Sequence, residues 1–224
     1  MGLRTILGLK KKKNLVYLNE SYAQEGEDNI LYRLFENRES GFFIDVGAHH
    51  PMRFSNTYKF YKMGWRGINI DAMPGSMEPF KLIRPEDINL EIPVSDVEEE
   101  SSFYIFNEPA LNTFSEAMAK ACDGKDNYKI EKVVTIKTQR LDNILDQYLP
   151  PGQPISFLSI DAEGFDHKIL LSNNWDKYRP EVVLLESDEG FTGIVNSALY
   201  KFMHEKGYEI IAKTVKTYFF KQTL

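Results

Sequence analysis

The sequence predicts a single α/β domain whose mostly parallel sheet carries helices on both faces and is closed by an antiparallel hairpin. Two observations favour this fold class. Short apolar segments typical of buried strands alternate with segments whose apolar residues recur at helical spacing, the order found in parallel sheets. The last two apolar segments, 208–212 and 217–220, lie close enough together to predict a hairpin. We expect residues 21–224 to form this domain and residues 1–20 to form an N-terminal arm.

The N-terminal half predicts one helix and then two strand–helix units. In the stretch 41–51, a run of Phe, Ile and Val leads into a tight turn at Gly47, where a ligand can lie against the main chain. Residues 55–57 are suited to begin a helix, and Gly64 is suited to end it. The expected elements are a helix around 30–35, a strand at 42–46, a helix at 58–61, a strand at 67–71, a helix through 80–82 and a strand at 87–94.

The C-terminal half continues the alternation. Two apolar segments flank a polar loop and short helix at 107–128, and we expect 107–126 to form a lid over an acceptor, since long loops in compact domains are often functional. The acidic run 98–100 predicts a solvated turn. The further elements are strands at 103–106 and 133–136, a helix at 141–148, a strand at 155–161, a helix at 169–171, a strand at 182–186 and a helix at 199–203 that ends near Gly207.

The overall charge and composition limit the class of partner. The 27 basic and 33 acidic residues give a net charge of −6, which disfavours binding to nucleic acid because phosphate backbones are bound mainly through basic surface. The single cysteine, Cys122, cannot form an internal disulfide, and no apolar run is long enough to cross a bilayer. We therefore expect a cytoplasmic protein without an integral membrane segment that acts on a small molecule. The lysine cluster 10–13 lies in the expected arm.

Acidic residues follow three of the predicted strands. Because the carboxyl ends of parallel strands meet at one edge of a sheet, we expect Asp45, Asp71 and Asp161 to point into one crevice. Asp71 lies about 20 residues beyond the glycine turn, the spacing at which a carboxylate hydrogen-bonds ribose hydroxyls. The alternative interpretation of Asp71 is a helix-capping aspartate.

The sequence of the turn indicates which kind of nucleotide it can bind. A dinucleotide site needs G-x-G-x-x-G so that the pyrophosphate can approach the main chain, whereas residues 47–52 read GAHHPM. One glycine, two histidines and a nearby acid suit a ligand without phosphate that carries positive charge. S-adenosylmethionine, which has an adenosine, a sulfonium and an amino group, fits this description better than a nicotinamide dinucleotide does.

Five motifs carry a resemblance to a known family. They are Ser21–Asp28, Ile44–His49, Ile70–Asp71, Pro93–Asp96 and Ser159–Asp166. In this order they resemble the FkbM family of S-adenosylmethionine-dependent methyltransferases, over residues 21–187. The resemblance implies a Rossmann-like class I methyltransferase fold with a seven-stranded sheet. It also implies O-methylation of sugars or other small metabolites in polysaccharide and natural-product pathways.

The resemblance and the strand-end pattern together give a predicted donor site. Its residues are Tyr22, Gln24, Glu25, Asp45, Gly47, Ala48, Asp71, Ala72, Ser95 and Asp96. The family likeness places residues 22, 24 and 25 in a cover over the donor, and their alternative interpretation is a polar start of a helix. Two departures are notable: His49-His50-Pro51 stands where many relatives have Asn, and Asp71 stands where Glu is frequent.

Methyl transfer to a hydroxyl needs a group that accepts the proton. We expect Asp161 and His49 to do this, one taking the proton and the other orienting the hydroxyl, with Glu163 and His167 as second choices. Helix-start hydrogen bonding is the alternative role for each histidine. A divalent cation on Asp161, Glu163 and His49 is possible but not favoured.

These observations predict an O-methyltransferase that acts on a sugar, a nucleotide-sugar or a glycan precursor. Methylation of a non-carbohydrate metabolite at oxygen or nitrogen stays open, because a donor site does not fix the acceptor. A nicotinamide-dependent oxidoreductase and a binding module without catalytic activity are the more distant alternatives. Arg53 and Arg66 are candidates to contact an anionic group of a nucleotide-sugar.

Overall fold

The computed structural model describes residues 18–223, so the lysine cluster 10–13 lies outside the described residues. The main sheet contains β1 (Phe42–Val46), β2 (Arg66–Asp71), β3 (Ile88–Glu91), β6 (Phe157–Ile160), β7 (Val182–Glu186), β8 (Tyr208–Lys213) and β9 (Thr217–Gln222). The helices are α1 (Glu27–Leu34), α2 (Tyr58–Lys62), α3 (Met77–Ile83), α4 (Glu116–Cys122), α5 (Leu141–Tyr148), α6 (Asp166–Leu171), α7 (Phe191–Ile194) and α8 (Ala198–Glu205). A separate pair of strands, β4 (Glu100–Phe106) and β5 (Ile130–Lys137), flanks α4 and a 3₁₀ helix, η1 (Pro109–Leu111).

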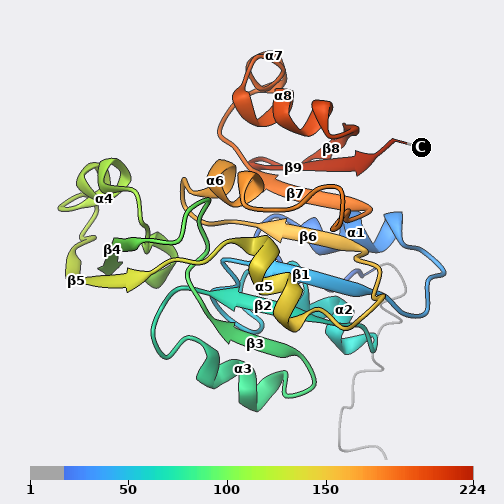
Figure 1. Ribbon diagram of the computed structural model, residues 1–224, viewed down its shortest axis with the longest axis horizontal. Coiled ribbons are helices and arrows are strands. Elements are labelled where there is room, and N and C mark those ends of the chain that lie inside the picture. Colours follow the sequence, from blue (N-terminus) through green and yellow to red (C-terminus); the bar gives the residue numbers. More distant parts are fainter. Residues whose placement is uncertain (1–17, 224) are drawn as a thin grey trace, which may run out of the picture.

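The seven strands of the main sheet follow the order β3-β2-β1-β6-β7-β9-β8 (Figure 1). The first five in this order are parallel, whereas β9 is antiparallel to β7 and β8 is antiparallel to β9. The mostly parallel, seven-stranded sheet with a C-terminal antiparallel hairpin is therefore confirmed.

Side chains of the main sheet alternate between its two faces, as the pleat of a strand requires. Ile44 and Leu158 belong to a core cluster that includes residues of α5, α6 and α8. Phe43 and Phe157 belong to a second cluster that includes residues of α1 and the aromatic ring of Phe60 on α2. Helices thus cover both faces of the sheet, as the sequence predicts. Within residues 18–223, no helix has the length and apolar character that crossing a bilayer requires.

The start of α2 agrees with the boundary predicted from the sequence, whereas β3 is shorter than predicted. The hydroxyl of Ser55 accepts a hydrogen bond from the N–H of Tyr58 at 3.0 Å, which supports the predicted start of α2. The strand expected at 87–94 is shorter, because the N–H of Asp87 donates to the carbonyl oxygen of Arg84 at 3.2 Å in the turn before β3. Pro93, which has no N–H, cannot extend the ladder at the other end.

The strands β4 and β5 do not join the main sheet. They pair antiparallel with each other and project with α4 beyond one end of the main sheet (Figure 1). Glu100, expected in a solvated turn, is the first residue of β4 and lies opposite Lys137 of β5. The position of the small sheet matters for function because the segment between its strands reaches back over the main sheet.

Candidate functional site

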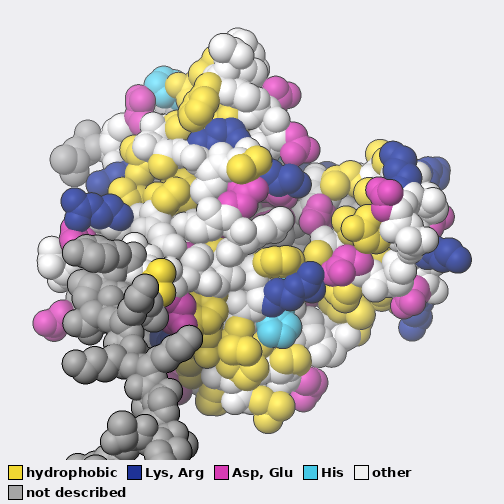
Figure 2. Space-filling view, turned by 180° about the vertical axis from the view of Figure 1, so that it is seen from behind, with side chains coloured by type: hydrophobic (Ala, Val, Ile, Leu, Met, Phe, Trp, Pro, Cys, Tyr) yellow, Lys and Arg dark blue, Asp and Glu magenta, His cyan; other side chains and the backbone are white. Residues whose placement is uncertain are grey.

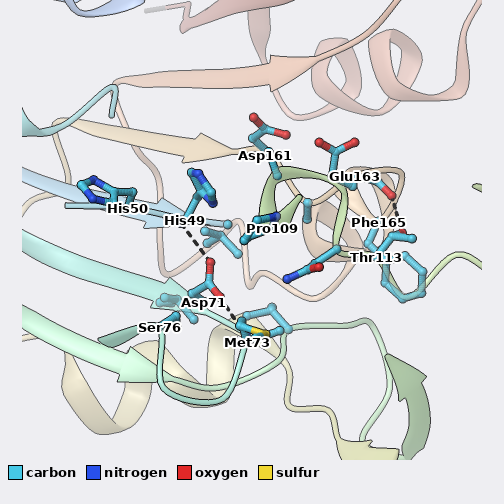
Figure 3. Close-up of a pocket in the computed structure, with 18 of the residues that line it drawn as sticks. His49, His50, Asp71, Met73, Ser76, Pro109, Thr113, Asp161, Glu163 and Phe165 are labelled. Carbon is cyan, nitrogen blue, oxygen red and sulfur yellow. Dashed lines mark hydrogen bonds between the residues drawn. The ribbon is translucent and has the colours of Figure 1, made fainter. Parts of the chain in front are cut away.

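A cavity of about 450 Å³ opens at the carboxyl ends of the parallel strands. Its walls come from the turn after β1, the end of β2, the segment after β6 and the region around η1. Figure 3 shows Asp161 and Glu163 side by side after β6, with His49 and Asp71 below them in the view. A ligand site at this edge of the sheet is what the parallel topology predicts.

The turn at Gly47 joins three strand ends. The N–H groups of Gly47 and Ala48 donate to the carbonyl oxygen of Ile70 at 2.9 and 3.1 Å, and the N–H of Asp161 donates to that of Val46 at 3.0 Å. Gly47 has a φ of +82°, and a Cβ there would lie 2.7 Å from the carbonyl carbon of Asp161 and closer still to its oxygen. Close packing between two strand ends therefore requires glycine at this position, independently of any ligand.

Asp71 ends β2 and places its carboxylate in the cavity wall. Its two oxygens accept hydrogen bonds from the N–H of His49 at 2.9 Å and the N–H of Met73 at 2.8 Å. Desolvation raises the pKa of Asp71, and these backbone donors oppose the rise. Each carboxylate oxygen can accept a second hydrogen bond, so Asp71 can fix the turn and still accept from a ligand hydroxyl. Its neighbour Ala72 also lines the cavity.

The two histidines of the turn have different roles. Nδ1 of His50 accepts from the N–H groups of Met52 and Arg53 at 3.1 and 2.9 Å, so His50 makes the backbone hydrogen bonds of the turn. His49 lines the cavity, and its buried Nε2 has no partner among the described residues. Desolvation lowers the pKa of His49, as does the positive charge of Arg53. His49 is therefore a neutral imidazole at pH 7 with one ring nitrogen available to a ligand.

Carboxyl groups gather on the opposite wall. Oxygens of Asp161, Glu163 and Glu186 lie within 4.8 Å of one another, and the ammonium of Lys216 lies 3.3 Å from Glu186. Asp161 lines the cavity and is exposed there. Desolvation and the neighbouring acids, Glu186 first, hold the pKa of Asp161 well above its usual range. Desolvation and Glu186 raise the pKa of Glu163 to about 7, so Glu163 exchanges a proton near neutral pH.

Strained backbone gathers at the same cavity. His49, Phe54 and Glu163 have φ values of +51°, +59° and +45°, although none of them is glycine, and all three line the cavity. The other non-glycine residues with positive φ among those described are Asn37, Asp126 and Asn127. Asn and Asp adopt this conformation readily, whereas Phe and Glu rarely do. Strain of this kind persists where surrounding structure enforces it, and it is typical of functional sites.

The segment between β4 and α4 forms one wall and holds Glu163 in place. The hydroxyl of Thr113 donates to the carbonyl oxygen of Glu163 at 2.7 Å, and Thr113 is itself buried. Met118 of α4 packs so closely on Gly164 that a Cβ there would overlap its sulfur atom. Part of the expected lid at 107–126 thus lies over the cavity, with Pro109, Ala110, Asn112, Thr113 and Phe114 in its wall.

The expectation that Asp45 shares this crevice is wrong. Asp45 does not line the cavity; it is buried beneath α2, where the hydroxyl of Thr57 donates to it at 2.9 Å. The guanidinium of Arg84 donates to that same hydroxyl at 2.9 Å. Asp45 is the last but one residue of β1, so the pleat directs its side chain into the helix layer. Asp71 and Asp161 lie at or just beyond a strand end, where the turn directs them into the cavity.

The predicted cover over the donor forms only in part. Gln24 lines the cavity. Tyr22 does not; its ring packs edge-on against Tyr58, with centroids 4.7 Å apart. Glu25 accepts from the N–H of Lys216 at 2.9 Å and faces a small adjoining pocket. Residues 22 and 25 are therefore held by the neighbouring helix and hairpin rather than by contact with the main cavity.

Four further predicted residues also lie outside the cavity wall: Ala48, Ser95, Asp96 and His167. Ala48 is buried in a cluster with residues of α3. Ser95 pairs with the backbone of Gln139, and the carbonyl oxygen of Asp96 accepts from Arg140 at 2.7 Å. His167 packs edge-on against Phe202 of α8, with ring centroids 6.1 Å apart. In each case the residue makes its contacts with a neighbouring segment outside the cavity wall.

The set of residues that could hold a metal also differs from the expected one. Among the described residues it is Asp161, Glu163 and Glu186, without His49. Sequence reasoning missed Glu186 although the signal was present, because Glu186 is an acid at the end of a predicted strand. It also missed Phe54 and Lys216, whose roles arise from contacts between segments far apart in the chain, whereas Thr113 belongs to the expected lid at 107–126.

The cavity suits S-adenosylmethionine in size and chemistry. Its volume lies within the range of about 300–1,000 Å³ that small-molecule sites occupy. Apolar side chains including Ile92, Val94 and Phe103 line one part of it, and the carboxyls of Asp161 and Glu163 line another. Such walls match an adenine ring and a positively charged centre. The unpartnered Nε2 of His49 offers a further hydrogen bond.

Comparison with known proteins shows the family of the chain. The model of the methyltransferase FkbM domain family matches residues 45–210. The structure is also similar to that of a TehB-like S-adenosylmethionine-dependent methyltransferase from Corynebacterium glutamicum, with 11% identity, a TM-score of 0.39, and coverage of 93% of this chain and 92% of that one. No protein of curated function matched the sequence. The chain is therefore an S-adenosylmethionine-dependent methyltransferase and belongs to the FkbM family.

Proposed function

We propose that the enzyme transfers the methyl group of S-adenosylmethionine to a hydroxyl of a sugar, a nucleotide-sugar or a glycan precursor. The observation that carries this proposal is a proton acceptor in the donor cavity: Glu163, whose pKa is raised to about 7. A hydroxyl is a poor nucleophile at neutral pH, and a carboxylate whose pKa lies near the working pH is an efficient base.

The cavity walls define how the donor would be held. Asp71 would accept hydrogen bonds from the ribose hydroxyls, and the apolar wall with Ile92 and Val94 would cover the adenine. The carboxyls of Asp161 and Glu163 would lie near the sulfonium. When bound, S-adenosylmethionine supplies an activated methyl carbon on a positively charged sulfur. The protein must then mainly align the acceptor oxygen with that carbon.

The carboxyl groups would divide the remaining work. Glu163 would take the proton as the acceptor oxygen bonds to the methyl carbon and the carbon–sulfur bond breaks towards sulfur. The products are a methyl ether, S-adenosylhomocysteine and protonated Glu163. Asp161, which lies beside Glu163 in the same wall, would form a hydrogen bond that orients the hydroxyl. Neutral His49 would complete the polar wall.

Three experiments test this function. Calorimetry should show binding of S-adenosylmethionine and none of NAD, and incubation with a panel of sugars and nucleotide-sugars should give a mass gain of one methyl group. Glu163→Gln should bind S-adenosylhomocysteine as the wild type does while turnover falls by about 10²–10⁴-fold, the usual contribution of a general base. Wild-type turnover in Glu163→Gln would remove the assigned base. Methylation of amines but of no hydroxyl would overturn the proposed acceptor.

A further inference from the structure

Arg53 stands out in the cavity wall because of its charge. It is the sole Lys or Arg among the described residues that line the cavity, in a wall that also holds Asp71, Asp161 and Glu163. The acids match a positively charged donor. The guanidinium of Arg53 is suited to bind an anionic group of a ligand, which a positively charged donor centre does not supply.

The backbone around Arg53 is fixed. His50 Nδ1 accepts from the N–H of Arg53 at 2.9 Å, and the N–H of Ser55 donates to the carbonyl oxygen of Tyr22 at 3.1 Å. Between these two anchors, Phe54 adopts a φ of +59° that its side chain disfavours. The strained turn keeps the Phe54 ring in the cavity wall even though 42% of the residue is exposed to solvent.

The guanidinium of Arg53 is oriented but has few partners. Its central carbon lies 4.3 Å from the centre of the Phe54 ring, a cation–π contact. Among residues 18–223 it has one ion pair, with Glu108, which is long at 3.5 Å, and about half of the Arg53 side chain is exposed. Most of its five N–H donors therefore remain available. A planar fork of this kind binds phosphate or carboxylate oxygens in pairs.

Arg53 and Phe54 together are better suited to bind an anionic sugar than to bind the donor. The exposed Phe54 ring offers an apolar surface for the C–H face of a pyranose, and the adjacent guanidinium is placed for a charged substituent of the same molecule. The amino-acid carboxylate of the donor is the competing anion. Because Arg53 and Phe54 face solvent at the cavity wall, an acceptor that enters from solvent matches them better than the donor carboxylate does.

We propose that Arg53 and Phe54 form an acceptor subsite that binds a sugar through an anionic group, a phosphate or a carboxylate. The subsite deepens the proposed function and rests on it for the identity of the reaction. The binding specificity of the subsite can nevertheless be measured without turnover. A failure of the subsite proposal is therefore distinguishable from a failure of the proposed function.

The test is a binding experiment on the full chain with saturating S-adenosylhomocysteine. Glucose 1-phosphate, UDP-glucose, glucuronate and methyl glucoside are titrated by calorimetry into the wild type, Arg53→Gln and Arg53→Lys. The matched control is Arg66→Gln, because Arg66 also pairs with a glutamate, Glu86, but lies outside the cavity wall. The phosphate and carboxylate probes show which kind of anion is preferred.

We expect the wild type to bind at least one anionic probe more tightly than methyl glucoside. Arg53→Gln should weaken that binding by about 10- to 100-fold, as for loss of a hydrogen bond to a charged group. Arg53→Lys should restore part of it, and Arg66→Gln should bind like the wild type. The affinity for S-adenosylhomocysteine itself should not change in any variant.

Three results would overturn the subsite. One is equal wild-type affinity for the anionic and neutral probes. The second is an equal loss of all probes in Arg53→Gln, which would indicate a structural role. The third is weaker binding of S-adenosylhomocysteine in Arg53→Gln, which would place the donor carboxylate on Arg53. Binding of an anionic probe that is never methylated would leave the subsite standing and count against sugar methylation alone.

Discussion

Replacing Gly47 by alanine tests whether packing of two strand ends builds the site. The substitution places a Cβ 2.7 Å from the carbonyl carbon of Asp161, on a residue with a φ of +82°. A left-handed backbone costs a non-glycine residue roughly 1–2 kcal/mol. Relief of the overlap requires the ends of β1 and β6 to separate, which weakens the bonds from Gly47 to Ile70 and from Asp161 to Val46. Each lost backbone hydrogen bond costs about 1 kcal/mol, so the total is about 3–4 kcal/mol.

Gly152 offers a matched control. It has a φ of +73°, and a Cβ there would meet nothing within 4 Å. Gly152→Ala should therefore show only the conformational cost of roughly 1–2 kcal/mol. The assay is urea unfolding of both variants and the wild type, with equal m-values as the condition for comparison. A difference below about 1 kcal/mol between the two variants would refute the reasoning, because it would mean that the strand ends move apart freely. Failure of Gly47→Ala to fold, with Gly152→Ala folded, would agree with it.

The remaining predictions concern protons and positioning. The value of kcat/KM should rise with pH through about 7, because Glu163 must be ionised to act as a base, and a flat profile from pH 6 to 8 would contradict this. Asp166, with a pKa raised from 3.8 to about 7 by burial, favours folding below pH 4 and loses that contribution as pH rises through 7. Asp166→Asn should therefore be more stable than the wild type at pH 8, by up to about 4 kcal/mol, and should lose this advantage at pH 4 in urea titrations. Thr113→Val should lower kcat about tenfold without changing donor affinity, because it removes the hydrogen bond to the carbonyl oxygen of Glu163, whereas Thr113→Ser should retain activity.

The fold followed from the sequence because its signals are local. The period of the apolar residues gives strands and helices, and their alternation gives a parallel sheet with a site at its carboxyl edge. Asp71 and Asp161 lie at that edge for this reason. Asp45 does not reach it, because one residue of difference along a strand reverses the direction of the side chain. The prediction treated all strand-end acids alike, and it would have needed the true end of β1 to separate them.

Contacts between distant segments could not be derived from the sequence. The small sheet pairs residues about 30 positions apart, and its loop then meets the turn after β6 through Thr113 and Glu163, which are 50 residues apart. Nothing in the local pattern specifies such a meeting. Glu186 is different: its place at a strand end was visible, but only the neighbouring order of β6 and β7 brings it beside Asp161.

The residues with strained backbone explain why part of the cavity wall could not be predicted from the sequence. Gly or Asn in a sequence normally indicates a left-handed backbone. Phe54 and Glu163 adopt this conformation without being either residue. Each is nevertheless held in this conformation, Glu163 by the hydrogen bond from Thr113 and Phe54 by its anchored turn. Glycine at either position would relieve strain of roughly 1–2 kcal/mol and would also remove the side chain from the cavity. The cost of strain is therefore tied to side chains that line the cavity, which is the pattern expected where function, rather than stability, determines the residue.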